Sequence, residues 1–115
     1  MENVTELNSE QLETIDKTRD WLMQQVDLDN LVEVEKVDRY CNLLKIFYYL
    51  DNDVYARGPV IEVGNGKQGF IKPNPALAEK NKINGSLLAI EKSFQLDKKA
   101  EQRRLEEAQK GPDLT

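Results

Sequence analysis

The fold of this chain follows mainly from residues 37–55, which read VDRYCNLLKIFYYLDNDVY. At 100° per residue, the apolar side chains of this stretch cover an arc of roughly 220°, whereas a helix packed on one neighbour needs a stripe of only about 100°. They are Val37, Tyr40, Cys41, Leu43, Leu44, Ile46, Phe47, Tyr48, Leu50, Val54 and Tyr55. We therefore predict a long helix from about Val32 to Arg57, buried against two different surfaces. One surface is its own domain, and the other is either more of that domain or another subunit.

The residues before and after this helix indicate where it ends and what precedes it. Gly58-Pro59 ends it, because glycine suits the left-handed position after a helix and proline cannot continue one. Upstream, Asn8-Ser9 offers capping oxygens for a first amphipathic helix, and residues 27–30 (DLDN) break that helix and can cap the long one. The apolar stripe of the first helix consists of Leu12, Ile15, Leu22, Met23 and Val26, with Trp21 nearly opposite.

Residues 60–63 and 70–72 predict two short strands that form a hairpin with a glycine-rich tip. An isolated hairpin is only marginally stable in water, so this one should pack on a helix or pair with another copy. Asn74 and Pro75 then suit the cap and first position of a new helix. Asp97 can cap a last, highly charged helix that ends near Lys110.

Together these signals predict a mostly α fold, in which a helical hairpin core of about four helices carries a small β-hairpin between the second and third helices. We divide the chain into a disordered N-terminus at residues 1–8, a helical core at 9–96 with the hairpin at 60–72, and a charged C-terminal helix and tail at 97–115.

The composition argues against an enzyme. The 115 residues include no histidine and a single cysteine, Cys41, which removes the commonest general base, the usual zinc ligands and any internal disulfide. We therefore expect no catalytic residue, no metal and no cofactor. The acidic N-terminus lacks the pattern of a signal peptide, and no apolar run approaches a membrane span, so we expect a cytoplasmic protein without a membrane partner.

Two further features of the sequence resemble sites of chemistry. Asp51 and Asp53 lie two positions apart and diverge by about 200° on a helix, so they cannot easily share a metal or a proton. Asp51 falls within the apolar arc, where a structural ion pair with a residue such as Arg39 is possible. Residues 64–69 (GNGKQG) match a phosphate-binding glycine pattern, but a strand follows and the other kinase motifs are missing, so we interpret them as a hairpin tip.

Positive charge is concentrated in the C-terminal third of a chain whose net charge is −5. Residues 1–71 contain 14 acidic and seven basic side chains, whereas residues 72–110 contain six acidic and nine basic ones. Any contact with a polyanion should therefore lie in the second segment. The candidates for DNA binding are Lys80, Lys82, Lys98, Lys99, Arg103 and Arg104. The alternative is ordinary solvated helix surface, since acidic residues lie among them.

The order of these features resembles that of the small terminase subunits of tailed phages. A tyrosine-bearing helix with VDRYCNLL at residues 37–44 is followed by a glycine-containing hairpin, by KPNPAL at 72–77 and by LLAIEKSFQL at 87–96. The resemblance extends from about Val34 to Arg104. The chain departs from the family where Leu-Thr-Pro is usual, which is Leu96-Asp97-Lys98 here, and Gln95 replaces the usual preceding glycine.

The resemblance implies a non-catalytic subunit of a viral packaging machine. Such proteins form homo-oligomeric rings, bind double-stranded viral DNA and recruit or regulate the large ATPase–nuclease subunit, in the cytoplasm of the bacterial host. Because the apolar arc of the long helix is wider than a small domain needs, we predict subunit contacts at Tyr40, Leu44, Phe47 and Tyr48. Trp21, on the first helix, is a further candidate for a subunit contact. The alternatives are a helical protein–protein adaptor or antitoxin-like regulator that does not bind DNA, and a nucleotide-binding fragment that uses the glycine loop.

Overall fold

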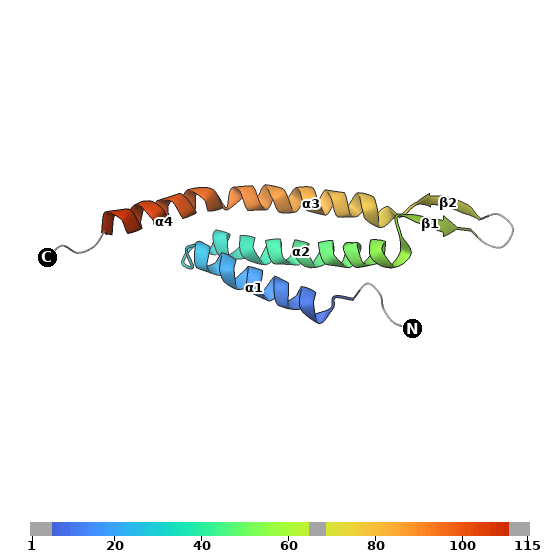
Figure 1. Cartoon of the computed structure of the whole chain (residues 1–115), viewed down its shortest axis with the longest axis horizontal. Coiled ribbons are helices and arrows are strands. Elements are labelled where there is room, and N and C mark those ends of the chain that lie inside the picture. The colour runs from blue at the N-terminus through green and yellow to red at the C-terminus, as the bar shows by residue number, and fades with distance from the viewer. Residues whose placement is uncertain (1–5, 65–68, 111–115) are drawn as a thin grey trace.

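The computed structural model describes residues 6–64 and 69–110, which form four helices and a two-stranded sheet. In chain order the elements are α1 (Ser9–Gln25), α2 (Leu31–Arg57), β1 (Val60–Val63), β2 (Phe70–Pro73), α3 (Pro75–Ser93) and α4 (Leu96–Lys110). Helix α2 packs against both α1 and α3, while the hairpin and α4 extend from opposite ends of this three-helix body (Figure 1). The molecule therefore measures 85 × 26 × 26 Å. The predicted mostly α fold, with the hairpin between the second and third helices, is confirmed.

Helix α1 begins where its capping sequence predicts. The Asn8 side chain accepts a hydrogen bond from the Gln11 backbone N–H at 2.7 Å, and the Gln11 side chain accepts one from the Asn8 N–H at 3.1 Å. This reciprocal capping box satisfies two N–H groups that a helix start otherwise leaves unpaired. Leu7, just before the cap, packs against the core. Residues 1–5, which form most of the predicted disordered N-terminus, lie outside the described residues.

Helix α2 has the predicted extent and clear signals at both ends. Its N-cap is Asn30, whose side chain accepts hydrogen bonds from the N–H groups of Val32 and Glu33. At the other end Gly58 adopts a φ of +86°, and its N–H donates to the Val54 carbonyl at 2.7 Å. A glycine adopts this conformation without the steric cost that a Cβ would add, which explains why the helix stops here.

The core of the molecule lies along the middle of α2. Its buried side chains come from all three helices of the body: Ile15, Leu22, Val26, Val37, Tyr40, Cys41, Leu87 and Phe94. The prediction that α2 is buried on two surfaces is therefore correct, and the chain supplies both surfaces itself through α1 and α3. Within the described residues, none of the helices combines the length and apolar character that a membrane crossing requires.

Strands β1 and β2 pair in antiparallel register, with Val60 opposite Pro73 and Val63 opposite Phe70. The second strand runs one residue further than predicted. Residues 65–68, which form most of the glycine-rich tip, lie outside the described residues.

The hairpin returns to the helical body at Asn74, which is only 1% exposed. Its side-chain oxygen accepts hydrogen bonds from the Ala76 N–H and from Arg57, while its amide nitrogen donates to Asp53 and to the Gly58 carbonyl. One side chain thus caps α3, as predicted, and also binds the end of α2. These four bonds satisfy both the oxygen and the amide nitrogen of the side chain, which is why this polar residue can be buried.

The joint between α3 and α4 differs from the prediction. Helix α4 begins at Leu96, and the Lys99 N–H donates to the Gln95 carbonyl at 3.0 Å. The prediction that Asp97 caps this helix is therefore wrong, because Asp97 already lies in its first turn. Gln95 has a φ of +54°, and this single left-handed residue is enough to end one helix and start the next. Asp97 still favours the helix start electrostatically.

Candidate nucleic-acid and subunit interfaces

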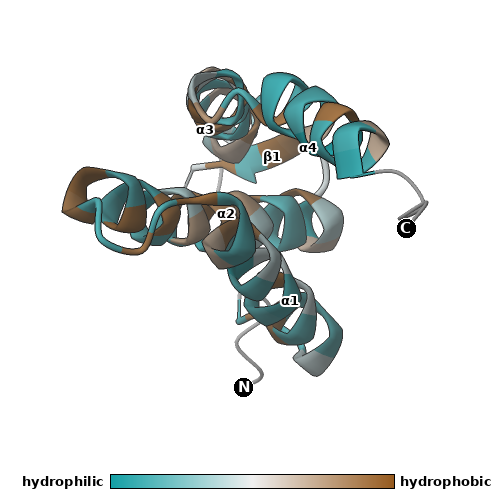
Figure 2. Ribbon diagram, turned by 90° about the vertical axis from the view of Figure 1, so that its left-hand side faces the viewer, coloured by the Kyte–Doolittle hydropathy of each residue, from teal (hydrophilic) through white to brown (hydrophobic). Residues whose placement is uncertain are grey.

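Helix α4 is an exposed arm, and none of its residues is fully buried. It is mostly hydrophilic (Figure 2). Its first residue, Leu96, packs against the core, and polar contacts hold the turns that follow. Arg103 donates a hydrogen bond to the Gln25 side chain at 2.6 Å, and the Lys99 ammonium lies 4.0 Å from a carboxylate oxygen of Glu33. Lys99 also lies 5.7 Å from the centre of the buried Phe94 ring. These contacts set the direction of the arm at its joint with α3.

The structure separates the six predicted DNA-binding residues into three pairs. Lys80 forms an ion pair with Asp51 at 2.6 Å, and Lys82 forms one with Glu79 at 3.2 Å. Lys99 and Arg103 make the arm contacts described above. Lys98 and Arg104 are exposed and have no ion-pair partner within the described residues.

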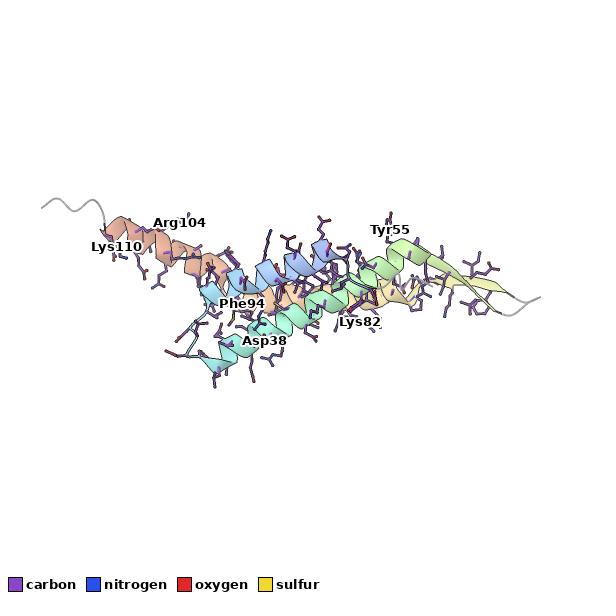
Figure 3. All side chains as sticks on the ribbon, turned by 90° about the horizontal axis from the view of Figure 1, so that it is seen from below. Asp38, Tyr55, Lys82, Phe94, Arg104 and Lys110 are labelled. Carbon is purple, nitrogen blue, oxygen red and sulfur yellow. The ribbon has the colours of Figure 1, made fainter. Side chains whose placement is uncertain are left out.

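Only the four residues on α4 are close in sequence and structure, and Figure 3 shows Arg104 on the arm, away from Lys82 on α3. A lysine that is already paired with a carboxylate on its own chain contributes less to phosphate binding than a free one. The arm is thus the better candidate for a nucleic-acid contact, and Lys98, Arg104 and Lys110 are its cations without an ion-pair or hydrogen-bond partner in the described residues.

Tyr40 was predicted at a subunit contact, and the structure places it inside the chain. Its ring meets Phe94 edge to face with centroids 6.1 Å apart, and its hydroxyl donates to the Glu91 carboxylate at 2.8 Å. Burial and the neighbouring carboxylate raise the pKa of the Tyr40 hydroxyl. In this conformation Tyr40 joins α2 to α3 and is covered by its own chain.

The other predicted contact residues lie in two places. Leu44, Phe47 and Tyr48 are half-buried and pack against the core, with Phe47 and Tyr48 edge to face at 6.2 Å. Trp21 lies on α1 and is 47% exposed. The structure therefore brings together the three α2 residues and leaves Trp21 apart from them.

Sequence reasoning missed a groove between α2 and α3. It has a volume of about 610 Å³ and is lined by Lys36, Asp38, Arg39, Asn42, Leu43 and Ile90. Arg39 was considered as the partner of Asp51, but that partner is Lys80. Arg39 is instead exposed beside the groove.

Comparison with known proteins gives one positive result. A family model described as "Phage terminase, small subunit" matches residues 21–111, which extend from the last turns of α1 to the end of α4. Comparisons with curated proteins and with solved structures gave no match.

Proposed function

The chain belongs to the phage terminase small-subunit family, and from this premise we propose that it is a ring-forming, non-catalytic component of a viral DNA-packaging machine. In this role it binds double-stranded viral DNA and recruits or regulates the large ATPase–nuclease subunit in the cytoplasm of the bacterial host. The observation that carries the proposal is the family match over residues 21–111, which include the long helix, the hairpin and the arm.

The exposed apolar side chains support self-association. They lie on several elements, and the largest exposed fractions among the leucines and valines occur where α2 begins, at Leu31 and Val32. Figure 2 shows this hydrophobic end of α2 turned toward the viewer. Monomeric proteins rarely leave large apolar patches uncovered, so a contact between copies is a physically sensible use for them.

The basic residues of α4 support DNA binding in an assembled form rather than by one copy. Each chain is acidic overall, and the exposed cations of its arm that form no ion pair within the described residues include Lys98 and Arg104. In a ring these cations repeat with the symmetry, so contacts that are weak individually add up along the phosphate backbone. The large subunit would supply the catalysis that a chain without histidine is poorly equipped for.

Light scattering after size exclusion, followed by DNA binding across a salt series, tests the proposal. We expect an oligomer that binds duplex DNA at low salt and releases it as salt rises. Changing Lys98, Lys99, Arg103 and Arg104 together to alanine should abolish DNA binding. A wild-type monomer would contradict the ring. An intact oligomer that never binds DNA would favour the adaptor or antitoxin-like alternative.

A further inference from the structure

Two exposed surfaces on different elements of this chain carry groups that can pair. The outer face of α4 has an apolar side chain next to a carboxylate, and the α2–α3 groove has apolar lining next to a cation. We propose that the outer face of α4 of one copy docks into the α2–α3 groove of a neighbouring copy. The inference rests on the proposed function, because it identifies the contact by which copies of the chain assemble.

The outer face of α4 is the side turned away from the chain's own core. Lys99 and Arg103 contact the body, and Leu105, two residues beyond Arg103, is rotated by about 200° from it around the helix. Leu105 is accordingly 57% exposed. The side chains around it on this face include Lys98, Glu101 and Gln109, whereas Gln102 and Glu106 also line a pocket with Gln24 and Gln25 of α1.

Helix α4 buries little of its surface against its own chain. Isolated helices of about 12–15 residues are marginal in water, and α4 has 15 residues of which none is buried. Its polar contacts with the body involve only Lys99 and Arg103 on one side. The family match nevertheless continues through the whole helix to residue 111. A contact on the opposite side would supply the missing burial.

The α2–α3 groove has the features that such a helix face requires. Leu43 and Ile90 line it with apolar surface, and Asn42 offers an amide beside them. Two of its charged residues are committed, since Asp38 pairs with Arg19 and Lys36 with Glu33. Arg39 has no ion-pair partner within the described residues, so it is the cation that remains for an incoming acidic side chain.

The match between the two surfaces identifies a second copy as the occupant. Leu105 enters the groove between Leu43 and Ile90, and Arg39 meets Glu101 from the arm. The chain's own arm cannot fill its own groove in this conformation, because Leu105 is turned outward while Arg103 is bonded to Gln25.

The contact joins two different surfaces, and this determines the type of assembly. In a head-to-tail contact each copy offers an arm to one neighbour and a groove to the other. Such copies form a ring if the rotation between neighbours closes, and an open filament if it does not. The contact is therefore compatible with the ring of the proposed function. A substitution in either the arm or the groove should disrupt it.

The first experiment measures self-association of the full chain by light scattering and sedimentation. Leu105→Glu should weaken it by roughly 100-fold or more, because a charge replaces the central apolar anchor of the contact. The matched control is Leu88→Glu on α3, since Leu88 is 56% exposed and lies outside the groove lining. Both positions are exposed in the monomer, so circular dichroism should show both variants folded.

The second experiment mixes two defective variants. Leu105→Glu keeps an intact groove, and Arg39→Glu keeps an intact arm, so each is expected to be monomeric alone while the mixture forms a 1:1 complex and nothing larger. Lys45→Glu, an exposed charge reversal on α2 outside the groove lining, is the control for Arg39→Glu and should leave assembly intact.

The outcomes separate this inference from the function on which it rests. An oligomer that survives both Leu105→Glu and Arg39→Glu overturns the arm-in-groove contact and leaves the ring standing. Two monomeric variants that never combine also overturn it. A wild-type monomer overturns the contact and the ring together.

Discussion

Gln95 is a residue whose conformation is unusual for its type. Its φ of +54° is left-handed, which costs a residue with a Cβ roughly 1–2 kcal/mol. The resemblance to small terminase subunits implies a glycine at this position, and glycine would adopt the conformation without that cost. We infer that Gln95 retains the joint geometry of a glycine at an energetic cost.

Gln95→Gly should therefore stabilise the protein. The relief of left-handed strain exceeds the extra chain entropy that glycine loses on folding, and we expect a net gain of about 0.5–1 kcal/mol. Urea denaturation at fixed protein concentration measures it. The matched control is Gln24→Gly, within α1, which should cost about 1 kcal/mol. A destabilised Gln95→Gly variant would contradict the strain argument.

Removing the Tyr40 hydroxyl distinguishes a role in the core from a role at a subunit interface. Tyr40→Phe removes its hydrogen bond to Glu91 and leaves the ring packing in place, so we expect a loss of about 1 kcal/mol in unfolding free energy. The oligomeric state should not change. Tyr55→Phe, at a 93% exposed position, is the control and should alter neither property.

Asp53 lies at the junction of α2, the hairpin and α3, and its carboxylate makes the free energy of unfolding depend on pH. Burial alone raises its pKa, but hydrogen bonds from Asn74 and Arg57 outweigh this and lower the pKa overall. The pKa of Asp53 is lower in the folded than in the unfolded chain. Its carboxylate therefore stabilises the fold fully above the unfolded pKa of about 3.9, and this stabilisation is lost as pH falls through the folded pKa.

Asp53→Asn should accordingly reduce stability at pH 7 and make the decline between pH 5 and strongly acidic conditions less steep. Chemical denaturation across that range measures both effects. Asp20→Asn, an exposed position on α1 without an ion pair in the described residues, should leave the acid decline unchanged. An acid decline identical to that of the wild type would show that Asp53 does not contribute to it.

At the scale of elements, the three-helix body and the α4 arm differ in how they are stabilised. The core cluster comes from α1, α2, α3 and the Phe94 that follows α3, whereas α4 contributes no buried residue. Local stability follows buried apolar contact, so the arm should open far more often than the body.

Hydrogen exchange of the monomeric Leu105→Glu variant should show this difference. We expect amides of α4 to exchange much faster than those near Tyr40 and Cys41 in α2, which are buried. In the assembled wild type the α4 amides should become protected, because a neighbour covers the arm. Slow exchange of α4 in the monomer would mean that its polar contacts alone hold the helix.

At the scale of the whole molecule, charge is divided between an acidic body and a more basic C-terminal third. Arg104→Ala should weaken DNA binding by a similar factor for all sequences and reduce its dependence on salt, because Arg104 is a free cation on the arm. Lys80→Ala is the matched control and should have a smaller effect, since Lys80 pairs with Asp51. Filter binding at several salt concentrations measures both. Equal effects would contradict the assignment of DNA contacts to α4.

The sequence by itself determined the elements and most of their ends. Periodicity, the capping side chains Asn8 and Asn74, and Gly58-Pro59 all act on residues within a few positions of themselves, so they can be recognised without a fold. The same local signals misplaced the start of the last helix, because Gln95 adopts a conformation that its residue type does not favour.

Only the tertiary structure decided which surfaces are used and which remain free. It covered the wide arc of α2 with α1 and α3, paired Asp51 with Lys80, and left Arg39 beside an open groove. Asp51 and Lys80 are 29 residues apart, and no local pattern selects between Lys80 and Arg39 as the partner. Such choices depend on how helices pack against one another, which is why the groove and the outward face of α4 could be recognised only in the folded chain.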